Sequence, residues 1–588
     1  MFVGLVLLRA KLPPPGVPTG GMNTLQTPEM TPSKEPSDTP APEPSQNASQ
    51  APEQIPSQQP PLAPTVTNTL PVVVKNMGQI GSFSQNSRIE ITLEGPQANG
   101  TDRAVNPFRV TADVIFNGPQ GQEYQVPAFF DGDGSGGMEG NVWKVRFRPE
   151  VPGVWEFVST SLEAKLDGYG GQFEVTPIAN MPVDPDQPAD DFSVLGTLRY
   201  DGGYYLRFSN GDYWIKTGID DPENFLGAAV GDWDAKKAVV DYLSSKGVNS
   251  IYVITNNIDG DRRDTWPWIG ESQEEAKANS DIFDIARLQQ WEDLFTYIQE
   301  KGIVLHIVLA DDSAWDGFDH ELYYREMVAR FGHHPALIWN IGEEANEIYS
   351  PQEQIDLAGM IKDIDPYDHP VTVHRLPIWP FFGKPEFDTT SIQSIDGGRN
   401  FTTTELGDQN GLVIIHRERS AAAGRPIPIM IDELPRVNQV TVATRTKLRS
   451  EVLYPIYFGG GNFELHFYDI YGQGGTVTFQ DLEPMLDDMR RVREFLEALP
   501  FNSMEPCEYL VTGRGSYCFG KPGQVYAIYL PTGGSIEIDL PGVETIYDVT
   551  WFDPRTGEKN SSGQVQGGAH RSFNAPESQD WVLLLKST

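Results

Sequence analysis

Two apolar runs in this sequence end in Glu side chains. The segment "ALIWNIGEEANE", residues 336–347, carries Glu343 and Glu344, and the segment "IPIMIDELPR", residues 427–436, carries Glu433. Two carboxyl groups that face one glycosidic bond can hydrolyse it: one protonates the leaving oxygen, and the other attacks the anomeric carbon or activates water. These three Glu residues are therefore candidates for such chemistry.

Other polar and aromatic residues follow apolar runs in the same way. Carboxylate, amide and imidazole groups can bind sugar hydroxyls, and Trp rings can stack on the apolar faces of sugars. The candidates for sugar binding are Asp220, Asn256, His374 and His466, and the candidates for stacking platforms are Trp266, Trp268 and Trp315. A Trp in a long loop often forms a small core of its own, so that alternative stays open. His306 lies inside an apolar run and is expected to be a buried core histidine.

Buried strands alternate with amphipathic helices between about residues 190 and 500. The strand-like runs are "DYWIKTGI", "VNSIYVIT", "IVLHIVLA", "ALIWNIG", "PVTVH", "TTSIQSI", "IPIMI" and "YPIYFGGGNFELHF". Helical periodicity separates most of them, as in "IARLQQWEDLFTYIQEKG" and "SPQEQIDLAGMIKDI". Continuous apolar strands are typical of a parallel sheet covered by helices, and eight of them predict a (β/α)8 TIM barrel whose strand ends meet on one face. A doubly wound open sheet is the alternative, but no Gly-rich phosphate loop follows the first strand.

Short alternating runs with Gly, Pro and Asn between them flank the barrel on both sides. They predict a β-sandwich over residues 72–180 and a second, smaller β-sandwich over residues 503–588, around a barrel at 190–500. Residues 1–71 are rich in Pro, Ser and Thr after a short apolar start, so we expect the remnant of an export signal and a disordered tether. A tether behind an export signal suggests a secreted or cell-surface protein.

Composition excludes several classes of partner. The formal net charge is 44 − 82 = −38, and such a surface repels phosphate backbones and anionic lipids, so neither nucleic acid nor membrane is expected. The nine His residues show no zinc spacing, so we expect no metal and no cofactor. Cys507 and Cys518 could bridge a local hairpin in an oxidising compartment, but two buried free thiols are the favoured interpretation.

Three long segments carry a resemblance to a known family. They are "DIFDIARLQQWEDLFTYIQEKGIVLHIVLA", "YYREMVARFGHHPALIWNIGEE" and "DIDPYDHPVTVHR", and they resemble the apiosidase-like glycoside hydrolases of clan A. The segment "NVWKVRFRPEVPGVWEF" is similar to the N-terminal β-sandwich of that family, and the C-terminal segment ending in "APESQDWVLLL" is similar to a domain labelled collagen-binding. The resemblance spans roughly residues 75–588.

The resemblance implies a role for each Glu. Clan A places an acid/base Glu at the end of strand four and a nucleophilic Glu at the end of strand seven, which implies Glu344 and Glu433. The clan has Asn before the acid/base, where this sequence has Glu343, so Glu343 stays an alternative acid/base. The implied mechanism is double displacement with retention, which needs carboxyl groups about 5–5.5 Å apart and a raised pKa for Glu344.

The leading hypothesis from the sequence is a secreted retaining glycoside hydrolase acting on a plant or algal polysaccharide or oligosaccharide. A non-catalytic carbohydrate-binding or adhesion protein on a glycosidase-like scaffold is the alternative. A polysaccharide lyase is a third possibility, which the strongly negative charge disfavours because its substrate is acidic. Carbohydrate is the expected partner, and the sequence leaves the sugar, the linkage and the oligomeric state open.

Overall fold

Parallel strands in the middle of the chain form a nearly closed ring. The computed structural model describes residues 78–178, 191–220, 225–260, 264–311, 315–395, 399–466, 479–513 and 515–588, with the backbone of 72–73. The ring runs in the order β12 (Thr217–Ile219), β13 (Ser250–Ile254), β14 (Val304–Val308), β15 (Leu337–Asn340), β16 (Val371–Thr372), β17 (His374–Arg375), β18 (Ser391–Gln393), β19 (Met430–Glu433) and β20 (Asn462–Leu465). β20 pairs with β12, and only Val373 separates β16 from β17, so one segment supplies both edges of the ring. The predicted central barrel is confirmed.

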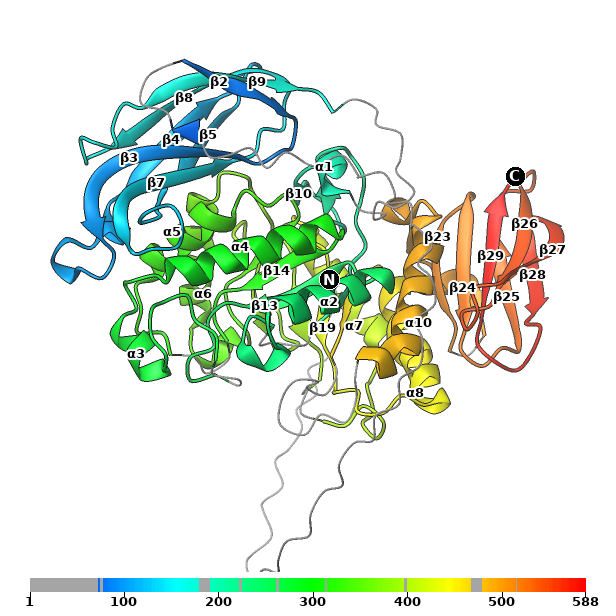
Figure 1. Cartoon of the computed structure of the whole chain (residues 1–588). Helices are drawn as coiled ribbons and strands as arrows, with labels where there is room; N and C mark the ends of the chain where they lie inside the picture. Colours follow the sequence, from blue (N-terminus) through cyan, green and yellow to red (C-terminus); the bar gives the residue numbers. More distant parts are fainter. Residues whose placement is uncertain are drawn as a thin grey trace, which may run out of the picture. The chain divides into compact units, whose positions relative to one another are not determined.

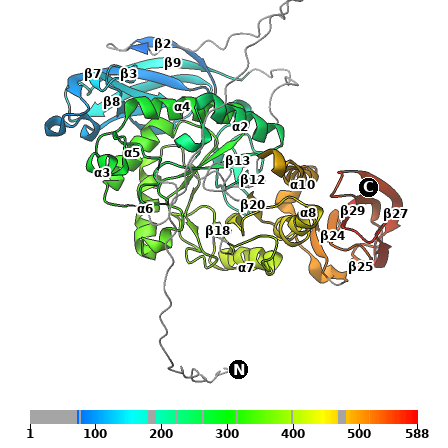
Figure 2. The same cartoon turned by 60° about the horizontal axis from the view of Figure 1, so that its bottom comes forward.

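Helices surround this ring, as Figures 1 and 2 show. They are α2 (Trp233–Ser245), α4 (Ile285–Glu300), α5 (His320–Phe331), α6 (Pro351–Ile364), α7 (Gln409–Ala422), α8 (Val442–Lys447), α9 (Tyr454–Phe458) and α10 (Phe479–Glu497), with the short α1 (Phe192–Leu195) and α3 (Gln273–Ala278) beside them. Side chains of Asp232, Asp284, Asp319 and Ser350 accept hydrogen bonds from the free N–H groups that begin four of the helices. No helix in the described ranges is long and apolar enough to cross a membrane.

The eighth strand is shorter than the sequence predicts. Residues of "YPIYF" form the helix α9, with Pro455 in its first turn, and the strand β20 begins only at Asn462. Proline fits the first turn of a helix because its missing N–H has no partner there in any case. The prediction that this run is one continuous strand was therefore wrong.

Two β-sheets form the region before the barrel. One contains β1 (Val72–Val73), β3 (Ile89–Asn99), β7 (Glu139–Phe147) and β6 (Phe129–Phe130), and the other contains β2 (Gln79–Ser84), β9 (Gly170–Thr176), β8 (Gly153–Ser161), β4 (Ala112–Asn117) and β5 (Glu123–Pro127). Trp143 and Phe147 from the first sheet and Trp155 and Phe173 from the second are buried in a common core. Alternate burial along β8 fits a strand with one face inward.

Buried charges of this sandwich contact the barrel. Arg146 Nη1 lies 3.0 Å from Oε2 of Glu292 on α4, and Arg330 Nη1 of α5 lies 3.3 Å from Oδ1 of Asp131. Each of these side chains is almost fully buried. A buried charge that loses its partner is strongly destabilising, so these pairs tie the sandwich to the barrel.

A second pair of sheets follows the barrel. The larger contains β21 (Glu505–Pro506), β23 (Tyr517–Lys521), β24 (Val525–Leu530), β29 (Trp581–Ser587), β26 (Ile546–Phe552) and β27 (Lys559–Gln566), and the smaller contains β22 (Val511–Thr512), β25 (Ser535–Leu540) and β28 (Ala569–Asn574). Ile528, Leu583 and Ile538 share a buried core between them. The two flanking β-rich regions are thus confirmed, whereas the predicted signal and tether lie outside the described residues.

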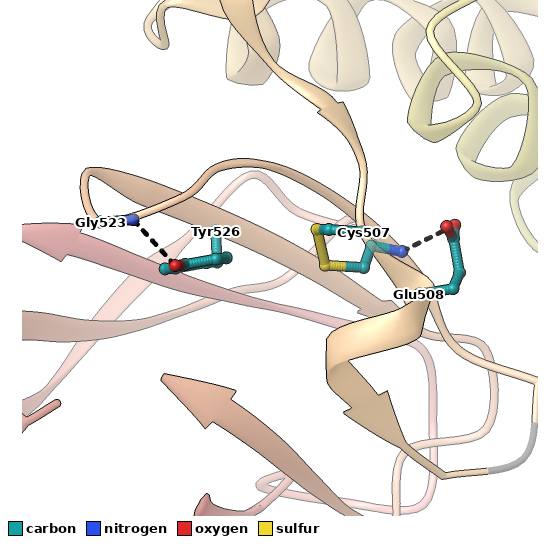
Figure 3. The surroundings of a disulfide bond; sticks show 5 residues. Cys507, Glu508, Gly523 and Tyr526 are labelled. Atoms are coloured by element: carbon teal, nitrogen blue, oxygen red, sulfur yellow. Dashed lines mark hydrogen bonds between the residues drawn. A yellow bond between two sulfur atoms is a disulfide. The ribbon is translucent and has the colours of Figure 1, made fainter. Parts of the chain in front are cut away.

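The two cysteines form a disulfide bond, which corrects the expectation of free thiols (Figure 3). β21 pairs with β23 in antiparallel register, and Cys507 N donates to Cys518 O at 2.9 Å. This pairing brings the two Cα atoms to 4.8 Å, within the range that a disulfide spans. Beside the bond, Glu508 Oε1 accepts a hydrogen bond from Cys518 N at 3.1 Å.

Candidate active site

The three candidate Glu residues lie at the same end of the barrel. Glu343 and Glu344 follow β15, and Glu433 is the last residue of β19. Since all strands of the ring are parallel, their carboxyl ends share one face of the barrel. His374, at the start of β17, lies close to two of these Glu side chains. Its Nδ1 is 2.6 Å from Glu343 Oε1, and its Nε2 is 3.7 Å from Glu433 Oε2.

Glu433 is buried among positive and hydrogen-bonding groups. Gln393 Nε2 donates to Glu433 Oε2 at 2.9 Å, and His466 Nδ1 lies 3.1 Å from Glu433 Oε1. Burial raises the pKa of Glu433, but the attraction of His466 and His374 and the hydrogen bond from Gln393 outweigh it and hold the pKa below its usual value. Glu433 is therefore a carboxylate at neutral pH.

Glu343 is held by two buried neighbours. Its Oε2 accepts a hydrogen bond from the hydroxyl of Tyr252, and its Oε1 pairs with His374. Burial lowers the pKa of His374, but the negative charges of Glu343 and Glu433 raise it to about 9, so His374 is cationic at neutral pH. Burial also raises the pKa of Glu343 itself. Both carboxylate oxygens of Glu343 thus have partners within the protein.

Glu344 differs from Glu343 in exposure, backbone and charge. Its side chain is half-buried, and its backbone is left-handed with φ 34° and ψ 37°. The other non-glycine residues with positive φ in the described ranges are Asn86, Asp259 and Asp368, of types that tolerate this conformation better than Glu does. Burial, and then the charges of Glu343 and Glu433, raise the pKa of Glu344 to about 7. Strain of this kind clusters at functional sites.

The polar residues predicted to bind sugar surround Glu433 in part. Asp220 Oδ2 lies 3.8 Å from His466 Nδ1, and one ligand-type atom of each of Asp220, Glu433 and His466 lies within 4.8 Å of the others. His374 joins the same group through its contact with Glu433. Asn256 is fully buried just after β13, where its Oδ1 accepts a hydrogen bond from Ile258 N at 3.3 Å.

The Trp candidates fit a small loop core better than a sugar platform. Trp268 is completely buried and packs edge-on against Trp315, with ring centroids 6.1 Å apart. Trp266 is also buried, beneath the guanidinium of Arg287. Trp268 therefore has no exposed face for a sugar, which corrects the expectation for this residue, whereas Trp315 is only partly buried.

A second layer of charge lies within the barrel below the Glu residues. Lys216 Nζ lies 2.9 Å from Asp432 Oδ1, 2.9 Å from Glu464 Oε1 and 3.1 Å from His306 Nδ1. Burial and the nearby Lys216 hold the pKa of His306 well below its usual value, so the ring is neutral. His306 is buried as expected, but in a polar cluster. Asn340 Nδ2, 3.2 Å from His306 Nε2, connects this layer to the site above it.

Two residues that form hydrogen bonds with the candidate Glu side chains were not predicted from the sequence. Gln393 and Tyr252 lie inside the predicted strand runs rather than after them, and each reaches a candidate Glu because alternate residues of a barrel strand point inward. A polar residue at an inward position near a strand end is the sequence feature that could have indicated them.

Carboxylate and imidazole groups near the site could in principle bind a metal ion. Glu343, His374 and Glu433 form one such group, and His306, Asp432 and Glu464 form another. In the second group Lys216 already forms an ion pair with each carboxylate, and in the first His374 is itself cationic. The donor sets therefore suit ion pairs better than a bound cation.

Comparisons with known proteins agree with this architecture. Residues 83–162 match a family model described as "Domain of unknown function (DUF5060)", and residues 510–586 match "Putative collagen-binding domain of a collagenase". No curated protein matches the sequence significantly. Among solved structures the chain is similar to a "putative glycoside hydrolase" from Bacteroides vulgatus, with 16% identity over 86% of this chain and 100% of that chain and a TM-score of 0.66.

The chain is also similar to two other solved structures, each with a TM-score above 0.5. One is described as "Glycoside hydrolase" and shares 18% identity over 68% of this chain and 98% of its own, with a TM-score of 0.56. The other is a glycoside hydrolase family 5 protein from Bacteroides vulgatus, with 16% identity, coverage of 68% and 95%, and a TM-score of 0.55. At these identities the likeness establishes a fold shared with glycoside hydrolases.

Proposed function

We propose that this chain is a retaining glycoside hydrolase in which Glu433 is the nucleophile and Glu344 is the acid/base. The observation that carries the proposal is a pair of neighbouring carboxyl groups whose pKa values are pushed apart. The pKa of Glu433 is lowered, while that of Glu344 is raised to about 7. Such a split lets one group attack as a carboxylate while the other donates a proton at the same pH.

The reaction proceeds in two steps. Glu433 attacks the anomeric carbon while Glu344 transfers its proton to the glycosidic oxygen, so the bond to the leaving group breaks and a glycosyl ester forms on Glu433. Glu344 then removes a proton from water, which attacks the same carbon and releases Glu433. Both steps invert the anomeric centre, and the product retains its configuration. Glu344 recovers its proton, so the protein returns to its starting state.

Gln393 supports the short separation that retention needs. Its Nε2 donates to Glu433, and it also lies within hydrogen-bonding reach of Glu344. Two carboxyl groups within reach of one amide lie close together, as the separation of about 5–5.5 Å in retaining enzymes requires, whereas inverting enzymes need a wider one.

Glu343 is the weaker candidate for the acid/base. Both of its oxygens are engaged, by Tyr252 and by His374, and its side chain is 8% exposed. Protonating a glycosidic oxygen would require it to leave these partners. Glu344 is half-buried, so its proton can reach a substrate. We infer that Glu343 instead sets the charge around Glu344.

The finer proposal is a secreted, apiosidase-like enzyme that acts on plant or algal polysaccharide or oligosaccharide. The sequence segments that resemble that family support it, and so does the disulfide, since disulfides persist mainly in oxidising compartments. The match of residues 510–586 to a collagen-binding-type model favours a second candidate, a non-catalytic adhesion protein. That candidate gives no account of the strained Glu344 or of its raised pKa.

Single substitutions test the two roles separately. Glu433→Ala should abolish cleavage of every glycoside, and azide should restore turnover to a glycosyl azide of inverted configuration, because the small anion replaces the carboxylate. Glu344→Ala should retain activity on 2,4-dinitrophenyl glycosides, whose leaving group needs no proton, and lose it on unactivated ones. Glu347→Gln, an exposed neighbour, is the control and should behave as wild type. Full activity of Glu433→Ala would refute the assignment.

A further inference from the structure

Gln393 carries a buried acceptor that no group among the described residues satisfies. Its side chain is 4% exposed, and its Nε2 donates to Glu433. Its Oε1 is buried and has no hydrogen-bond partner in the part of the chain that the structure describes. Buried polar atoms are nearly always paired, because an unpaired acceptor loses its hydration without replacement. An orphaned carbonyl oxygen beside a catalytic carboxylate therefore points to a donor that arrives with the substrate.

The orientation of this amide is fixed by its neighbours. Glu433 is ionised, so its oxygens only accept hydrogen bonds, and the NH2 end of Gln393 must face it. Turning the amide over would bring two oxygens together without a proton between them. Oε1 therefore lies on the other side of the amide, away from the Glu433 oxygen that Nε2 contacts.

The place of Gln393 indicates which substrate group can reach it. The anomeric carbon must lie between Glu433, which attacks it, and Glu344, which protonates the oxygen it leaves. Gln393 is close to both of these carboxyl groups. The hydroxyl on the carbon next to the anomeric centre, C2, is the sugar donor closest to the nucleophile, and its hydrogen bonds strengthen in the transition state. Glu343 is the poorer acceptor for this hydroxyl because Tyr252 and His374 already bind its two oxygens.

We propose that Gln393 Oε1 accepts a hydrogen bond from the C2 hydroxyl of the sugar whose bond is cleaved, so the substrates are glycosides with an unsubstituted hydroxyl at C2. This inference rests on the proposed hydrolase function and adds a substrate class to it. A 2-deoxy sugar offers no group at that position, and a 2-O-methyl or 2-O-sulfated sugar offers no proton. Each of them leaves the acceptor unpaired in the complex.

The test compares two substrates in three proteins. The value of kcat/KM is measured for an aryl glycoside that the wild type cleaves and for its 2-deoxy analogue, in wild type, Gln393→Met and Ser391→Ala. Met matches the shape of Gln without either polar end. Ser391 also carries a buried hydroxyl that has no partner among the described residues, but it lies two residues earlier on β18, roughly 6–7 Å further from the strand end. It is therefore a matched control that cannot touch the substrate.

The informative quantity is the ratio of the two kcat/KM values. Gln393→Met also removes the hydrogen bond to Glu433, but that loss slows both substrates and cancels in the ratio. We expect the preference of the wild type for the 2-hydroxy substrate to fall at least about tenfold in Gln393→Met, the effect of one lost hydrogen bond to a buried group, and to be unchanged in Ser391→Ala. Thermal unfolding of each variant checks that it folds, and Gln393→Asn, which retracts the amide, replaces the Met variant if it does not.

Three results would overturn the inference. An unchanged ratio in a folded Gln393 variant would show that the C2 hydroxyl has another partner. A wild type that favours the 2-deoxy glycoside over its parent by as much as spontaneous hydrolysis does would show that the protein does not recognise the hydroxyl, because the electron-withdrawing C2 hydroxyl slows formation of the oxocarbenium-like transition state. In both cases the hydrolase function would stand, whereas a wild type inactive on every glycoside would refute that function and this inference with it.

Discussion

Replacing Glu343 by Gln should move the alkaline limb of the pH–rate profile toward lower pH. Glu344 must be protonated to donate, and its pKa of about 7 is raised first by burial and next by the negative charge of Glu343. A negative neighbour disfavours the ionised form of Glu344, so removing that charge lowers the pKa. The proton is then lost at lower pH, and kcat/KM falls earlier as the pH rises.

The size of this shift follows from the charges around Glu344. Two unit charges about 6 Å apart interact by roughly 2.8 kcal/mol at an effective dielectric constant of about 20, which is about two pKa units. His374, 2.6 Å from Glu343, lowers the pKa of Glu344 while it is cationic, and it becomes less cationic when its partner is neutral. The two changes partly cancel, so we expect a net shift of about one unit.

The assay is kcat/KM for an aryl glycoside with a poor leaving group, measured from pH 4 to pH 9. Glu347→Gln removes the same charge from an exposed position on the same segment and should leave the alkaline limb unchanged. Urea unfolding of both variants shows whether the fold is intact. A folded Glu343→Gln protein with an unchanged alkaline limb, or with one moved to higher pH, would refute this account of Glu344.

Two further predictions concern stability. Lys216→Met should cost about 3–5 kcal/mol in urea unfolding because Glu464 is left buried without its cation, and adding Glu464→Gln should recover part of that loss; a cost below about 1 kcal/mol would contradict the buried pair. Reducing the bond between Cys507 and Cys518 should lower the stability of the C-terminal sandwich by about 3 kcal/mol, the chain entropy of its short loop, without changing kcat. Identical thermal unfolding with and without reductant would argue against that bond.

Much of the fold follows from local sequence pattern. Short apolar runs such as "SIYVI" and "VLHIV" favour strands buried on both faces, and their alternation with capped helices leaves the barrel as the simplest arrangement. Local pattern is a weaker guide to α7 and α10, because Gly411 and Pro484 lie inside these helices and disfavour them, although each helix buries one face in the fold. Intrinsic helix propensity is only a weak guide where tertiary packing determines the secondary structure.

The candidate site was predictable only where it lies at strand ends. Glu343, Glu344 and Glu433 stand out because carboxylates follow apolar runs. Gln393 and Tyr252 do not stand out, because their contacts depend on which residues face inward and on the register between distant strands. The pairing of β21 with β23 is a further long-range feature, and without it the disulfide could not be predicted.

The most direct test of the central claim is the anomeric configuration of the first product. Wild-type protein would be screened on aryl glycosides and on plant and algal polysaccharides, and the sugar released from a cleaved substrate would be followed by NMR before it mutarotates. Double displacement through Glu433 and Glu344 predicts a first product with the same anomeric configuration as the substrate. A product of inverted configuration, or binding of these carbohydrates without cleavage of any of them, would contradict the account.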